Sequence, residues 1–260
     1  MKLGVNIDHI AVLREARQIN DPNPLDALGI VKRAGADQIT IHLREDRRHI
    51  QDTDAYNIIY LSTLPVNLEC SIASEMIRIA CELRPHRVTL VPEKREEVTT
   101  EGGLNLVTNK LRLRDAIETL HKFEIEVSLF IDPTFENLEI SKDLGVEWIE
   151  FHTGKYANLY AMLYANLSNT HHHIKALELP RKELAIMLEK ELNNLRALSS
   201  DAVKMNLRVA AGHGLNYENV QEIVNIESIE ELNIGQSIIA RSIFTGLEQA
   251  ILDLKTLLLR

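Results

Sequence analysis

Short runs of apolar and β-branched residues recur along the chain, and each is followed by a longer segment whose apolar positions have helical spacing. This alternation is typical of parallel strands joined by right-handed crossover helices. Eight units of this kind close naturally into one (β/α)8 TIM barrel, an α/β fold, although a doubly wound open sheet uses a similar pattern. The predicted strands lie at residues 3–8, 38–43, 66–70, 87–91, 126–131, 148–152, 207–211 and 229–234.

The segment between predicted strands six and seven is longer than one crossover helix requires. We therefore predict a single domain over residues 1–260 with extra helices, including an inserted helical region at about 155–203. The apolar and aromatic face of this region either covers the flank of the barrel or forms a subunit interface. The run at 171–173 is predicted to be a polar loop. The apolar and aromatic face of the inserted region consists of Tyr156, Leu159, Tyr160, Leu163 and Tyr164.

Composition narrows the class of protein. The formal net charge of −9 gives no general attraction to nucleic acid or anionic lipid, so we expect no partner of either kind. Cys70 and Cys81 have no spacing typical of a disulfide framework or a zinc site, and we expect reduced core thiols. The chain lacks a signal-like start and a long apolar run, which predicts a soluble, cytoplasmic protein.

Ionisable and amide side chains stand where the predicted strands end. Active sites of TIM barrels lie at the carboxyl ends of the strands, so these groups are expected to meet in one site. Any one of them could belong to a structural ion-pair network, but their convergence favours function. They are Asn6, Asp8, His9, His42, Arg44, Glu69, Glu150, His152 and His213.

Two glycine-containing turns follow predicted strands seven and eight, at residues 211–214 and 233–237. Glycine lets backbone N–H groups approach an anion, and barrels often bind phosphate at this pair of strands. Arginines after strands one and two, among them Arg17 and Arg44, predict a second anion site. The loop at 92–103 is long for a β-to-α connection, and its glycine pair could act as the hinge of a lid.

Several segments closely resemble the pyridoxine 5'-phosphate synthase family. The resemblance covers nearly the whole chain and leaves out only residues from about 159 to 204. The segments that carry it are 4–10 (GVNIDHI), 41–50 (IHLREDRRHI), 67–69 (NLE), 91–103, 127–132 (VSLFID), 150–154 (EFHTG), 211–215 (AGHGL) and 231–235 (ELNIG).

The resemblance implies a TIM-barrel enzyme that condenses 3-amino-2-oxopropyl phosphate with 1-deoxy-D-xylulose 5-phosphate. The products would be pyridoxine 5'-phosphate, phosphate and water, formed without metal or cofactor by a homo-octamer. His42 and Glu69 would be acid–base residues, His213 a further proton-transfer residue and Glu150 a stabiliser of a charged transition state. Substrate contacts would come from Asn6, Arg17, Gly214, Gly235 and Gln236 for the aminoketone phosphate, and from Asp8, His9, Arg44, His49 and Thr99 for the deoxyxylulose phosphate.

One position departs from the family pattern: Gln236 stands where histidine is frequent. A backbone N–H contact to phosphate would survive this change, whereas a charged side-chain contact would not.

Two other functions stay open from the residues alone. The first is a metal-dependent barrel aldolase or isomerase, in which His9, His42, Glu69, Glu150 and His152 would be ligands. The second is a phosphate-ligand sensor without catalytic activity, because a fold does not by itself establish an activity.

Overall fold

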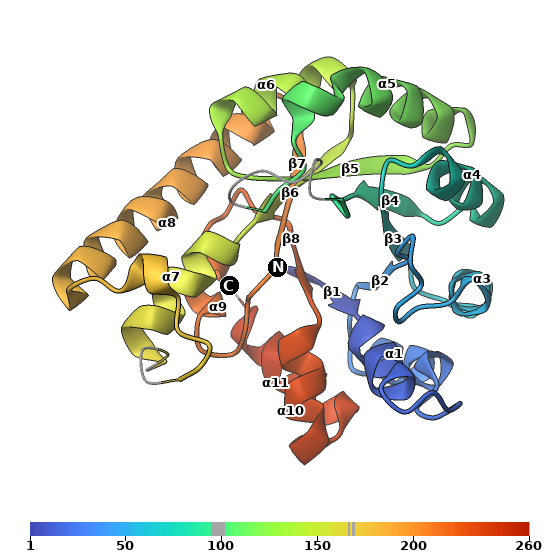
Figure 1. Ribbon diagram of the computed structural model, residues 1–260, viewed down its shortest axis with the longest axis horizontal. Coiled ribbons are helices and arrows are strands. Elements are labelled where there is room, and N and C mark those ends of the chain that lie inside the picture. The colour runs from blue at the N-terminus through green and yellow to red at the C-terminus, as the bar shows by residue number, and fades with distance from the viewer. Residues whose placement is uncertain (95–101, 166, 168–169, 260) are drawn as a thin grey trace.

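The computed structural model describes residues 1–94, 102–165, 167 and 170–259. Within these ranges eight parallel strands form a closed barrel in chain order, which confirms the predicted TIM-barrel fold (Figure 1). The strands are β1 (Lys2–Asn6), β2 (Gln38–His42), β3 (Val66–Cys70), β4 (Arg87–Leu90), β5 (Glu126–Ile131), β6 (Trp148–His152), β7 (Arg208–Gly212) and β8 (Glu231–Ile234).

Helices surround the strands, and α8 extends away from the barrel on one side (Figure 1). Short 3-10 turns at Pro24–Asp26 and Lys175–Leu177 complete the regular structure of the described residues. The helices are α1 (Asp8–Glu15), α2 (Ala27–Arg33), α3 (Asp52–Leu61), α4 (Ser74–Leu83), α5 (Leu106–Lys122), α6 (Phe135–Leu144), α7 (Gly154–Tyr164), α8 (Arg181–Lys204), α9 (Val220–Val224), α10 (Gln236–Thr245) and α11 (Leu247–Leu257).

Alternation along the strands separates an apolar outer layer from a polar barrel interior. Leu3 and Val5 of β1, for example, belong to the main hydrophobic core, which also contains buried residues of the helices. Side chains at intervening positions bond across the barrel: Arg87 of β4 forms an ion pair of 2.7 Å with Glu231 of β8. Because β4 and β8 are not neighbours in the sheet, this contact must cross the interior. Many TIM barrels fill this space with branched apolar side chains, whereas in this chain polar side chains such as Arg87 and Glu231 occupy part of it.

The predicted strand positions are right, but several boundaries are wrong. β1 ends at Asn6, and Asp8 is the first residue of α1, where a carboxylate interacts favourably with the helix dipole. β2 ends at His42 and β4 at Leu90, one residue earlier than predicted. β7 and β8 begin one and two residues later than predicted, because the preceding residues belong to the connecting turns.

The inserted region between β6 and β7 consists mainly of α7 and the 24-residue α8. Tyr156, Leu159 and Leu163 are buried in the hydrophobic core, so this part of the face covers the barrel. Tyr164 is 55% exposed. The run at 171–173 lies in an exposed turn between α7 and α8, as predicted. In the described parts of the chain, no helix has both the length and the apolar character needed to cross a membrane.

Candidate active site

A cavity of about 810 Å³ opens at the carboxyl ends of the strands. Side chains from both halves of the barrel line it, so residues far apart in the sequence meet there. Ten of the fourteen predicted site residues are among its lining: Asn6, His9, His42, Arg44, Glu69, Glu150, His213, Gly214, Gly235 and Gln236.

Two carboxyl groups, the partly buried Glu69 of β3 and the buried Glu150 of β6, line the cavity. Burial, together with the negative charges of Glu150 and Asp8, raises the pKa of Glu69 well above its usual range. Burial also raises the pKa of Glu150 to about 7, against a hydrogen bond from Asn233 that lowers it. The raised pKa of Glu69 favours its protonated form, and Glu150 can change its charge near neutrality.

The His42 imidazole lies between the side chains of two glutamates. Its Nδ1 is 3.9 Å from Oε2 of Glu69, and its Nε2 is 3.0 Å from Oε1 of Glu93. The backbone N–H of His42 donates to Oδ1 of Asp8 at 2.9 Å. The ring and backbone of His42 are thus both held by acidic groups.

Asp8 lies behind the cavity rather than in its lining. Its carboxylate accepts hydrogen bonds from the side-chain amide of Asn6 and from the backbone of His42. Burial raises the pKa of Asp8 to about 6, while His42 and Arg44 lower it. The adjacent His9 lines the cavity, and burial lowers the pKa of its imidazole.

A pair of imidazole rings, those of His152 and His213, lies on the side of the cavity opposite His42. The ring centroids of His152 and His213 are 5.0 Å apart, and Nδ1 of His152 is 3.4 Å from Oδ1 of Asp132. Burial and the charge of His152 lower the pKa of His213, which favours the neutral ring at pH 7. Gly154 gives the rings their space, because a Cβ there would lie 2.6 Å from Nε2 of His152.

The two predicted phosphate-binding turns border the same cavity. Gly214 has a φ of +78°, and a Cβ on it would lie 2.6 Å from the Cβ of Ala157. Gly235 packs against Asn6, and α10 begins at the next residue, Gln236. The first turn of α10 therefore presents backbone N–H groups at the cavity, an arrangement that suits an anion.

The remaining predicted residues lie elsewhere. Arg17 is exposed in the turn after α1 and is not part of the cavity lining. His49 is half-buried behind His42, with ring centroids 6.0 Å apart, and burial and the charge of His42 lower its pKa to about 4. Thr99 and most of the predicted lid lie outside the described residues.

Arg14 is another cation near the predicted second anion site, but its guanidinium is already paired with a carboxylate of the protein. Its guanidinium forms two hydrogen bonds of 2.9 and 2.6 Å with the carboxylate of Asp54 at the start of α3. Such a bidentate pair satisfies the buried charge, so Arg14 contributes to structure rather than to a ligand site.

Three further polar residues, which were not predicted from the sequence, hold the cavity's side chains: Glu93, Asp132 and Asn233. Each lies within or just beyond the end of a strand, which was the available signal. Asp132 pairs with His152 and accepts a hydrogen bond of 3.0 Å from the Gly103 N–H. Asn233 donates to Glu150, and Glu93 contacts His42.

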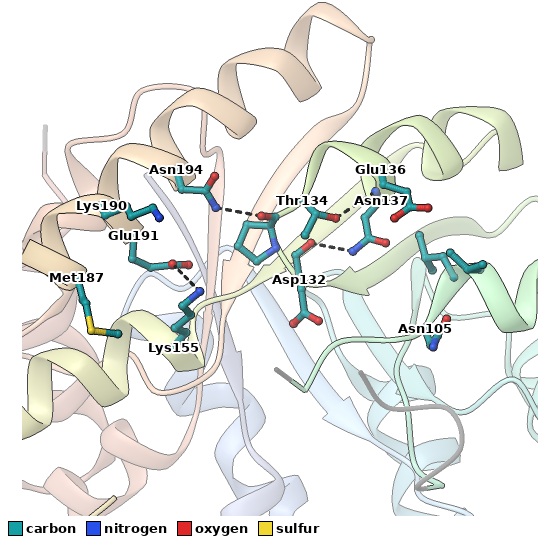
Figure 2. Close-up of a pocket in the computed structure, with 13 residues that line it drawn as sticks. Asn105, Asp132, Thr134, Glu136, Asn137, Lys155, Met187, Lys190, Glu191 and Asn194 are labelled. Carbon is teal, nitrogen blue, oxygen red and sulfur yellow. Dashed lines mark hydrogen bonds and ion pairs between the residues drawn. The ribbon is translucent and has the colours of Figure 1, made fainter. Parts of the chain in front are cut away.

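A second cavity, of about 830 Å³, lies between the first turns of α5 and α6 and the flank of α8 (Figure 2). None of the fourteen predicted site residues lines it. Lys155 and Glu191 form an ion pair of 3.2 Å across part of its wall, and the Asp132 carboxylate points away from Thr134 and Asn137. The size of a cavity therefore does not identify the site here, whereas the convergence of ionisable groups does.

Among the residues that the structure describes, no group of three or more His, Cys, Asp or Glu side chains is arranged to hold a metal ion.

Solved structures with the same fold include KGPDC from Streptococcus mutans, with a TM-score of 0.61, 12% identity, and coverage of 98% of this chain and 96% of that one. Thiamine phosphate pyrophosphorylase from Pyrococcus furiosus gives a TM-score of 0.59 at 12% identity and covers 99% and 95% of the two chains. At this identity the likeness shows the TIM-barrel fold alone.

The family model described as "Pyridoxal phosphate biosynthesis protein PdxJ" matches residues 3–260, a range that includes the inserted region. Pyridoxine 5'-phosphate synthase of Sulfurovum sp. (strain NBC37-1) is 71% identical over 258 residues, covering 99% of this chain and 100% of the relative. The enzyme of the same name from Aliarcobacter butzleri (strain RM4018) is 66% identical, with 99% of both chains covered. The chain therefore belongs to the pyridoxine 5'-phosphate synthase family of biosynthetic enzymes.

Proposed function

We propose that this chain condenses 3-amino-2-oxopropyl phosphate with 1-deoxy-D-xylulose 5-phosphate by acid–base catalysis, releasing pyridoxine 5'-phosphate, phosphate and water. The observation that carries this proposal is the meeting of Glu69 and His42 in one cavity with the first turn of α10. Proton carriers and an anion-binding helix terminus are the two things that such a reaction requires.

The protonation states of the side chains suit the required steps. Condensing an amine with a ketone needs a proton donor for the departing water, and Glu69, whose raised pKa favours the protonated form, can supply it. Ring closure needs removal of a proton from carbon, for which the neutral imidazole of His213 is an acceptor. Glu150, ionised in part near pH 7, can stabilise a cationic transition state.

Substrate binding is assigned by the same reasoning. Four lining residues near the first turn of α10 would hold the aminoketone phosphate: Asn6, Gly214, Gly235 and Gln236. The two glycines would contribute backbone N–H groups, and Asn6 its side-chain amide. His9 and Arg44, which line the cavity after β1 and β2, would hold the deoxyxylulose phosphate. We keep Arg17, Asp8, His49 and Thr99 as proposed substrate-binding residues; in this structure Asp8 and His49 lie behind the cavity lining.

The decisive experiment incubates the purified protein with both proposed substrates. We expect phosphate release in step with the absorbance of the ring product, and no signal when either substrate is omitted. Binding of both substrates without turnover would favour the sensor instead. Activity that is lost with a chelator and restored by a divalent cation would favour the metal-dependent alternative.

We also propose a cytoplasmic homo-octamer. Large apolar side chains lie on the surface of the single chain, including Phe244 of α10 at 88% exposure and Leu111 of α5 at 80% exposure. Exposed groups of this size are typical of association surfaces. Light scattering should give about eight times the chain mass of 29.5 kDa, and a monomer would contradict the proposal.

A further inference from the structure

Glu93 holds the imidazole of His42 from outside the cavity. It lies three residues beyond Leu90, the last residue of β4, and its side chain is only 4% exposed. Oε1 is 3.0 Å from Nε2 of His42, while Oε2 accepts a hydrogen bond of 2.9 Å from the Glu45 N–H. Glu93 does not line the cavity, whereas His42 and Glu69 do.

The three side chains form a line of carboxylate, imidazole and carboxyl group. His42 presents Nε2 to Glu93 and Nδ1 to Glu69, with the Nδ1 to Oε2 distance at 3.9 Å. An ionised carboxylate only accepts hydrogen bonds, so the ring nitrogen that faces it must carry the proton. Catalytic histidines in other folds are oriented in this way by a carboxylate that does not itself react.

We propose that Glu93 is a positioning residue that fixes the His42 proton on Nε2 and turns the Nδ1 lone pair toward Glu69 and the cavity. The inference rests on the proposed acid–base role of His42. It adds a residue that orients the base, and it states which ring nitrogen exchanges protons.

The charge of Glu93 supports this assignment. Burial alone would raise its pKa, but hydrogen bonds from His42 and the Glu45 N–H, and the charges of His42 and Arg44, lower the pKa below its ordinary value. Glu93 is therefore an anion at neutral pH. Burial and the charges of Glu150 and Asp8 raise the pKa of Glu69, on the other side of the ring, which favours its protonated form. Because 3.9 Å is too long for a direct hydrogen bond, a proton would pass between Glu69 and Nδ1 through a substrate atom or water between them, while Glu93 stabilises the imidazolium without taking its proton.

Glu93→Gln tests the proposal. The side-chain amide has one acceptor oxygen, so it can accept only one of the two hydrogen bonds that the Glu93 carboxylate accepts from His42 and the Glu45 N–H. The amide oxygen must stay on the Glu45 N–H, so the amide N–H₂ faces Nε2 of His42 and donates to it. The His42 proton then moves to Nδ1. Long-range ¹H–¹⁵N spectra of protein labelled in histidine should show this exchange of tautomers, with the His42 signals assigned by their loss in His42→Asn.

Activity provides the second readout. We expect kcat of Glu93→Gln to fall by about 10²- to 10⁴-fold, the range for loss of an oriented acid–base group, with KM changed much less. Glu93→Asp keeps the charge and should restore the wild-type tautomer and part of kcat. The matched control is Glu75→Gln, an exposed carboxylate 3.5 Å from Arg47, whose kcat should stay within about twofold of wild type.

A pH profile alone would not separate these effects, because several groups face the His42 ring. They are Glu69 from β3, Asp8 from α1, Arg44 and His49 after β2, and Glu93 itself. An unchanged His42 tautomer in folded Glu93→Gln would overturn the proposal, as would wild-type kcat. If wild-type protein forms no ring product, the proposed function fails, while the tautomer comparison still tests the Glu93 contact.

Discussion

Asn233 of β8 donates a hydrogen bond of 2.7 Å from its side-chain amide to Oε2 of Glu150 on β6, across the interior of the barrel. Its amide oxygen is in turn held by the Thr40 hydroxyl at 3.1 Å, which fixes the direction of the donor. Two glycines leave room for the pair. A Cβ on Gly4 would lie 2.1 Å from the Asn233 oxygen, and one on Gly212 would lie 2.2 Å from Glu150.

Removing this donor should change the pH dependence of the reaction. The hydrogen bond from Asn233 lowers the pKa of Glu150, so Asn233→Ala should raise that pKa above about 7. Glu150 would then become ionised only at higher pH, and the acidic limb of the kcat profile should move in the same direction. An acidic limb at the wild-type position would show that the ionisation of Glu150 does not govern kcat.

Replacing Glu69 removes the proposed proton donor without changing the shape of the site. Glu69→Gln should fold normally and lose about two to four orders of magnitude in turnover, the usual range for a general acid–base group. Circular dichroism and single-turnover kinetics measure the two effects separately. Turnover near that of wild type would remove Glu69 from the mechanism.

The raised pKa of Glu150 also predicts how stability depends on pH. Between about pH 4.5, the ordinary value for glutamate, and about pH 7, the folded chain retains a proton that the unfolded chain has released. The stabilisation that this retained Glu150 proton gives the folded chain is therefore fully present below about pH 4.5 and is lost as the pH rises through about 7. Urea unfolding of Glu150→Gln should show a flatter decline over this window, by up to about 1.4 kcal/mol per pH unit. Parallel curves for the two proteins would contradict the assignment.

Gly154 should tolerate no side chain, although helices generally favour alanine over glycine. A Cβ at this position would lie 2.6 Å from the ring of His152 and 3.4 Å from that of His213. Gly154→Ala is expected to displace His152 and to lower kcat by about tenfold or more, since small misplacements are costly in catalysis. Gly29→Ala in α2 is the control. Its nearest neighbour is the flexible end of Arg33 at 3.6 Å, and we expect unchanged kcat and up to about 1 kcal/mol of added stability.

The ion pair inside the barrel should matter for folding rather than for binding. Arg87 pairs with Glu231 at 2.7 Å, and its guanidinium stacks on Trp148 at 4.1 Å from the ring centroid. Arg87→Met leaves the Glu231 charge buried without this partner, which should lower the free energy of unfolding by about 3–5 kcal/mol. Arg78→Met breaks only an exposed i,i+4 pair with Glu82 and should cost about 0.5 kcal/mol or less. Equal effects in denaturant titrations would refute this distinction.

The fold and most members of the candidate site could be predicted from the sequence. Apolar alternation in the strands, helical spacing between them and polar strand ends are local properties, so the barrel and residues such as His42 and Glu69 could be predicted. The location of Asp8 in α1 rather than in β1 was not predicted, because one polar residue fits either the end of a strand or the start of a helix.

Only the tertiary structure decided which polar groups hold one another. Glu93 and His42 are 51 positions apart, and Asn233 and Glu150 are 83 apart, so neither contact leaves a local pattern. The pKa values of the carboxyl groups likewise depend on burial and on neighbours from other strands. Local preference fixes the strands and helices, whereas closure of the barrel creates the distances that give the site its protonation states.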